Sequence, residues 1–72
     1  MNKMEFYSVV FYDGDEFYFK NRGHAFSYLW SEFLNSLTGR ESTEYIEDKR
    51  IEMNETYAIE NFGMIRVLGF ED

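Results

Sequence analysis

His24 is the only histidine in the chain and the side chain best suited to proton transfer near neutral pH. A histidine base needs a reacting group within hydrogen-bond reach, and a histidine metal ligand needs further ligands beside it. The sequence has no cysteine and no second histidine. His24 also falls within the first turn of a predicted helix. We therefore expect an exposed histidine and predict no catalytic residue.

Three carboxylates, Asp13, Asp15 and Glu16, lie close enough in sequence to attract a hard cation. Calcium loops of the EF-hand type also need oxygen ligands at fixed offsets and a distal bidentate glutamate, and that pattern does not occur. Asp13-Gly14 is itself a favoured hairpin turn. The five glycines are scattered singly, so no phosphate-binding loop is formed. The sequence predicts no metal, no cofactor and no enzymatic activity.

The strongest remaining signal is a run of acids with interleaved aromatic residues between Glu41 and Glu60. Acidic surfaces speed the encounter with basic proteins, and aromatic side chains are frequent anchors of interfaces. Closely spaced carboxylates would also imitate the phosphates of a nucleic acid. The alternative is a solvated edge whose charges discourage aggregation, and both interpretations stay open. The residues expected to bind a protein are Glu41, Glu44, Tyr45, Glu47, Asp48, Glu52, Glu55 and Tyr57.

The overall charge limits the class of partner. Fourteen acidic residues face seven basic ones among 72, which gives a net charge of −7. Free nucleic acid and anionic membranes would be repelled, so we expect a larger protein with a basic surface as partner. The apolar run from Met4 to Tyr12 contains Glu5 and is too short for an export signal or a membrane span. We expect a cytoplasmic protein.

The chain is expected to form one domain, residues 1–72, on a small core rich in its fifteen aromatic residues. Its central element is an amphipathic helix over 21–39, with Asn21 as N-cap and Gly39 at its C-terminal end. The predicted stripe of this helix recurs at helical spacing and comprises Phe26, Leu29, Trp30, Phe33 and Leu37, widened by Leu34.

Residues 4–20 predict a β-hairpin that turns at Asp13-Gly14. We expect a loop of two or four residues and discount three, because three would set Glu16 and Lys20 against the apolar side. The face expected beneath the helix carries Met4, Phe6, Ser8, Val10, Tyr12, Phe17 and Phe19. The opposite face places Tyr7, Val9, Phe11 and Tyr18 half-exposed, as an oligomer face in a second hypothesis.

The second half of the chain predicts a loop over 40–44, a strand over 45–53 and a final strand over 64–70. Residues 54–63 fit either a short helix or a strand over 57–60 followed by a turn, and the strand is favoured. The fold class is therefore α+β. Its antiparallel sheet has four or five strands with one helix across one face, in the order ββα followed by ββ or βββ.

In its whole character, very short, acidic, aromatic-rich and cysteine-free, the chain is similar to small phage-encoded proteins that inhibit a host enzyme or defence system. That resemblance implies binding without catalysis, in the host cytoplasm. The first functional hypothesis is a non-catalytic acidic module that inhibits a larger basic protein, including one that handles nucleic acid. The alternative is a homo-oligomer or small structural subunit that buries its second sheet face.

Overall fold

A computed structural model describes the backbone of residues 3–71 and the side chains of residues 6–69. The described chain is α+β, with one four-stranded antiparallel sheet and two helices. Its elements, in chain order, are β1 (Lys3–Phe11), β2 (Glu16–Phe19), α1 (Arg22–Ser36), α2 (Thr43–Thr56), β3 (Ala58–Ile59) and β4 (Gly63–Glu71). The strand order across the sheet is β2-β1-β4-β3, so the two long strands lie at its centre.

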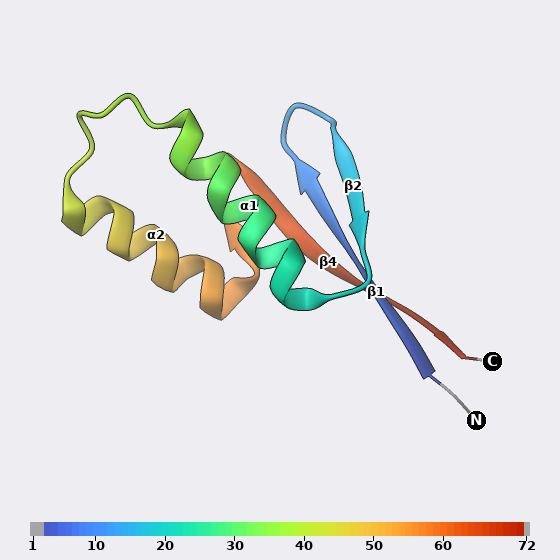
Figure 1. Ribbon diagram of the computed structural model, residues 1–72. Helices are drawn as coiled ribbons and strands as arrows, with labels where there is room; N and C mark the ends of the chain where they lie inside the picture. The colour runs from blue at the N-terminus through green and yellow to red at the C-terminus, as the bar shows by residue number, and fades with distance from the viewer. Residues whose placement is uncertain (1–2, 72) are drawn as a thin grey trace.

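Both helices lie on the same side of the sheet (Figure 1). The first helix, α1, contacts β1, β4 and β2, while α2 lies beside it and contacts β3. Towards the termini, β1 and β4 continue past the helices as a two-stranded ribbon (Figure 1). The hydrophobic core therefore sits at the helical end of the molecule.

Phe11 and Asp15 form the last backbone pair of the hairpin, one step beyond the Val10–Glu16 pair, so the loop has three residues, 12–14, and the expectation of two or four residues is wrong. The Phe11 amide donates to the Asp15 carbonyl at 2.8 Å, and the Gly14 amide donates back to the Phe11 carbonyl at 2.9 Å. Gly14 has a φ of +107°, a left-handed conformation that glycine adopts without steric cost. A tight turn closed by such a residue is the usual three-residue hairpin.

This loop exchanges the faces of β2, because a change of one residue in register turns every side chain over. Phe17 now pairs with Val9, and Phe19 pairs with Tyr7. The expectation that the helix covers the Phe6–Val10 side is also wrong, because it covers the side with Val9. From the sequence, a three-residue loop is disfavoured because it would set Glu16 and Lys20 against the side covered by the helix. Since the helices cover the other side, Glu16 and Tyr18 point away from them and no charge is buried.

The predicted helix is confirmed as α1, with a different C-terminal end. Asn21 is the N-cap and its side chain accepts from the His24 amide at 3.0 Å. The helix closes at Leu37, whose backbone is extended, and Gly39 lies in the following loop with a φ of +88°. The expected stripe is displaced by part of a turn: the fully buried positions are Ala25, Leu29 and Phe33, and Leu34 is exposed.

The predicted loop over 40–44 is confirmed for residues 40–42 and ends two residues early, and the predicted strand over 45–53 is wrong, because residues 43–56 form α2. Ser42 is its N-cap and accepts from the Tyr45 amide at 3.0 Å. Tyr57 closes it in a left-handed conformation, with φ +60°. Its apolar face is narrow, with Met53 buried and Ile46 half-buried, so the sequence shows little amphipathic signal.

The buried core joins every described element except β2. It consists of Val9, Ala25, Leu29, Phe33, Met53, Ile59 and Ile65. Both residues of β3 lie within the predicted strand over 57–60, and the turn and final strand that follow are confirmed as 60–62 and β4. Since β3 pairs only with the start of β4, most of β4 has a free edge.

Candidate protein-binding site

Four of the predicted binding residues lie together on the solvent side of α2. Glu44, Asp48 and Glu55 recur at positions i, i+4 and i+11, so they share one side of the helix. Ile51 lies among them with 46% of its surface exposed, and Glu47 lies beside them. Within the described part of the chain, the carboxylates of Glu44, Asp48 and Glu55 have no ion-pair partner. We call Glu44, Glu47, Asp48, Ile51 and Glu55 the α2 outer face.

Two cations of α2 are held by carboxylates of the same helix. Arg50 donates from two nitrogens to Glu47, and these hydrogen bonds hold the pKa of the Glu47 carboxyl below its ordinary value. The Lys49 ammonium lies 3.3 Å from the Glu52 carboxylate and 4.0 Å from that of Glu60. These pairs neutralise part of the acidic run between Glu41 and Glu60. The Glu52 carboxylate is paired with Lys49 of the same helix and is therefore not offered to another protein.

The remaining predicted residues have intramolecular roles. Glu41 accepts from Thr38 and Gly39 in the α1–α2 loop; burial opposes ionisation, but these hydrogen bonds outweigh it and lower the pKa of the Glu41 carboxyl. The Tyr57 ring packs edge-on against Phe26, and its hydroxyl accepts from Arg22 at 2.9 Å. The ring of Tyr45 tilts against that of Phe33 and is 40% exposed.

The charge density of α2 is far below that of a nucleic acid. Between Glu44 and Glu55 there are five carboxylates and two cations. Eleven residues of helix span about 16 Å, so one net charge falls on roughly every 5 Å of its axis. Duplex DNA carries one charge per ~1.7 Å. The α2 outer face therefore resembles an ordinary acidic protein surface more than a phosphate backbone.

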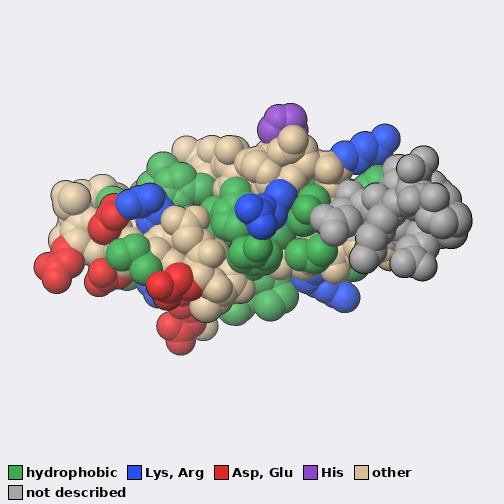
Figure 2. Space-filling model, turned by 90° about the horizontal axis from the view of Figure 1, so that it is seen from below, with side chains coloured by type: hydrophobic (Ala, Val, Ile, Leu, Met, Phe, Trp, Pro, Cys, Tyr) green, Lys and Arg blue, Asp and Glu red, His purple; other side chains and the backbone are tan. Residues whose placement is uncertain are grey.

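On the face seen in Figure 2, acidic side chains gather at the end where α2 lies, while hydrophobic side chains occupy the middle. Comparisons with protein-family models, curated proteins and solved structures found no match to this chain. No helix of the described chain is long and apolar enough to cross a membrane.

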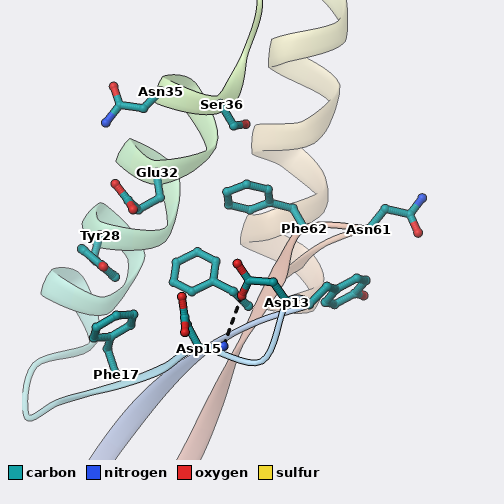
Figure 3. Close-up of a pocket in the computed structure, with 11 residues that line it drawn as sticks. Asp13, Asp15, Phe17, Tyr28, Glu32, Asn35, Ser36, Asn61 and Phe62 are labelled. Atoms are coloured by element: carbon teal, nitrogen blue, oxygen red, sulfur yellow. Dashed lines mark hydrogen bonds between the residues drawn. The ribbon is translucent and has the colours of Figure 1, made fainter.

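A groove of about 690 Å³ lies between the β1–β2 turn, α1 and the β3–β4 turn. Its floor is aromatic: the ring of Phe11 meets those of Phe17, Tyr28 and Phe62 edge-on, with centroids 5.5–6.1 Å apart. Figure 3 shows Tyr28 and Glu32 on α1 on one side, with Asp13 and Asp15 of the hairpin on the other. The groove thus has an aromatic floor and acidic side chains on its two sides.

Two of the three carboxylates of the groove act on the Tyr28 hydroxyl. Burial raises the pKa of the Tyr28 hydroxyl, and the negative charges of Glu32 and Asp15 raise it further. None of the three carboxylates forms an ion pair within the described residues. Sequence patterns could not join Glu32 to Asp15, because the two lie on different elements and their approach depends on the three-residue loop.

The four residues of the expected oligomer face do not lie on one surface. Val9 is fully buried under α1, and Tyr7 and Phe11 are half-buried on the same side, whereas Tyr18 lies on the opposite side with 66% of its surface exposed. His24 is exposed on α1. Among the described residues, no cluster of three or more His, Asp or Glu side chains is arranged to hold a metal ion.

Proposed function

We propose that this chain is a non-catalytic protein-binding module whose α2 outer face contacts a basic surface of a larger protein. The observation that carries the proposal is the stripe of Glu44, Asp48 and Glu55 around the exposed Ile51. Such a stripe combines charges that steer the encounter with an apolar side chain to be buried on contact. By covering the partner's basic surface, the module acts as an inhibitor.

Unpaired carboxylates support this interpretation over a merely solvated helix. A helix that only needs solubility gains by pairing its charges at i, i+4, as Glu47 and Arg50 do at i, i+3. Glu44 and Asp48 are instead like charges one turn apart, which destabilises the isolated helix slightly. A cationic partner removes that repulsion on binding.

The proposal is tested by neutralising the stripe without changing the shape of its side chains. The variant Glu44→Gln/Asp48→Asn/Glu55→Gln should slow association with the partner captured from the native cell by about tenfold at low salt, because local steering is lost. Association rates are measured at low and high ionic strength by biolayer interferometry. At high salt the difference from the wild type should shrink, since screening removes the same attraction.

A matched control changes the net charge by the same amount elsewhere. The variant His24→Lys/Ser27→Lys/Ser31→Lys adds three positive charges to exposed positions of α1. It should slow association by less than about threefold, because only the long-range field changes. Equal slowing by both variants would mean that overall charge, and not α2, governs binding; unchanged association in the amide variant would refute the proposal.

The second candidate function is a homo-oligomer formed through the open face of the sheet. This face points away from both helices and comprises Phe6, Ser8, Val10, Glu16, Tyr18, Met64, Arg66 and Leu68. Tyr18 and Met64 are exposed on it, and Ser8 is fully buried between Tyr18 and Arg66 with no hydrogen-bond partner for its hydroxyl within the described residues. Glu16 and Arg66 lie on different strands, which suits antiparallel stacking of two copies.

Substituting this face separates the oligomer from a monomer. If two copies stack here, Tyr18→Ser/Met64→Ser should convert a dimer to a folded monomer in sedimentation velocity, since each loses apolar contact area. Tyr12→Ser, which removes an exposed aromatic residue at the turn, should leave the dimer intact. A wild-type chain that sediments as a monomer at high concentration excludes this candidate.

A further inference from the structure

We infer that the groove between the β1–β2 turn and α1 binds the guanidinium side chain of an arginine carried by an extended segment of a basic protein. This site lies apart from the α2 outer face. The inference rests on the proposed function in one respect, because it takes a basic protein as the source of the arginine.

The charges of the groove select a cation. Asp13 and Asp15 lie on one side and Glu32 on the other, and among the described residues no lysine or arginine lines the groove. The ion pairs of the described chain are confined to α2 and Glu60, so these carboxylates are free to accept new hydrogen bonds from a ligand. Arginine presents five donors in a planar fork, which can reach carboxylates on both sides at once.

The aromatic floor selects a flat, weakly hydrated cation over a compact ammonium. Phe17 has 41% of its surface exposed, and its ring meets that of Tyr28 with centroids 5.3 Å apart. A guanidinium group stacks on such rings by cation–π attraction while its aliphatic stem covers apolar surface. The volume of about 690 Å³ lies within the range of pockets that enclose small ligands. It admits the whole side chain with part of the flanking backbone.

The acidic rim is held in place before a ligand arrives. The Asp13 carboxylate accepts from the Asp15 amide at 3.2 Å, which fixes one side of the turn. The Tyr12 amide donates to the Phe62 carbonyl at 3.0 Å and joins the β1–β2 turn to the β3–β4 turn. Because these contacts exist within the folded chain, little ordering remains to oppose binding.

The test uses two small probes of nearly the same shape, one cationic and one neutral. Acetyl-arginine-amide and its neutral analogue acetyl-citrulline-amide are titrated into the full ¹⁵N-labelled chain, and amide shifts are followed by NMR. The arginine probe should give saturable shifts at Asp13, Asp15, Glu32 and Phe62. Citrulline should bind at least about tenfold more weakly, since its neutral ureido group has fewer N–H donors and forms no charge-assisted hydrogen bonds with carboxylates. Equal shifts with both probes would overturn the inference.

Variants locate the site and separate it from the proposed function. Asp15→Asn/Glu32→Gln should weaken the arginine probe about tenfold, and Phe17→Leu about threefold through loss of the ring. Glu47→Gln, an exposed acid of α2, should leave probe binding unchanged. Full affinity in the Asp15/Glu32 variant would overturn the inference. The probe does not involve α2, so failure of the α2 variants to slow the captured partner refutes only the proposed function.

An extended peptide decides the source of the cation. A peptide with a single arginine flanked by alanines should bind several-fold more tightly than the amide probe, because the groove also contacts its backbone. Replacing that arginine with lysine should weaken the peptide. Equal affinity of the peptide and the single amino acid would assign the groove to a free small cation and overturn the protein source.

Discussion

Replacing Leu29 with alanine is expected to lower the free energy of unfolding by about 3 kcal/mol, within the range of roughly 2–5 kcal/mol for a buried leucine. Leu29 has no exposed surface and lies at the centre of the core that joins α1 to the sheet. Its side chain also lies directly against the start of β4, where a Cβ at Gly63 would come within 3.1 Å of Leu29 Cδ1. A chain this short has a total stability of only ~3–5 kcal/mol, so the variant should be largely unfolded at physiological temperature.

Circular dichroism during urea and thermal unfolding measures this effect. A loss of about 3 kcal/mol corresponds to a fall in Tm of roughly 15 °C for a domain of this size. The control is Leu34→Ala on the same helix, where the leucine is exposed, and it should cost less than about 1 kcal/mol. If the two variants were equally stable, the orientation of α1 on the sheet would be wrong.

Replacing Gly63 with alanine should destabilise the fold by about 2 kcal/mol through overpacking. The added Cβ would lie 3.0 Å from the Val10 carbonyl oxygen and 3.3 Å from Phe11 Cδ1, besides its contact with Leu29. The Val10 oxygen belongs to the backbone of β1, so relief requires the two central strands to move apart. The backbone of Gly63 itself is not left-handed, so the effect measures space and not conformation.

Gly69 provides the matched control in the same strand. Among the described residues, no heavy atom lies within 4 Å of a Cβ built at Gly69, and its φ is not positive. Gly69→Ala should therefore stabilise the chain by about 0.5 kcal/mol, because alanine restricts the unfolded chain more than glycine does. Equal effects of the two substitutions in a urea titration would contradict the close approach of α1, β1 and β4 at Gly63.

Local signals were strong for the first half of the chain. Asn21 before an apolar stripe predicted the start of α1 correctly, because an N-cap acts only on the next turn of backbone. The alternating aromatic residues of 4–20 predicted two strands for the same local reason. The predicted side of the sheet for the residues of β2 was wrong, because one residue more or less in the loop around Gly14 turns every side chain of β2 to the other side.

Weak amphipathicity explains why the sequence did not predict the helix over 43–56. Only Met53 is buried in α2, and its outer face carries Ile51, so apolar residues occur on two sides of the helix. The features that define it are the Ser42 cap and ion pairs such as Glu47 with Arg50, three residues apart. These contacts are local and polar, and a pattern based on apolar periodicity does not register them.

The sequence by itself determined the α+β class, the approximate extents of the hairpin strands, the start of α1 and the net negative charge. Each of these depends on residue type or on neighbours within a few positions. Only the tertiary structure decided which sheet face is covered, which acids are unpaired, and that Asp15 and Glu32 line one groove above an aromatic floor. Those properties depend on residues far apart in the chain, whose approach is fixed by packing around Leu29 and by one left-handed glycine at position 14.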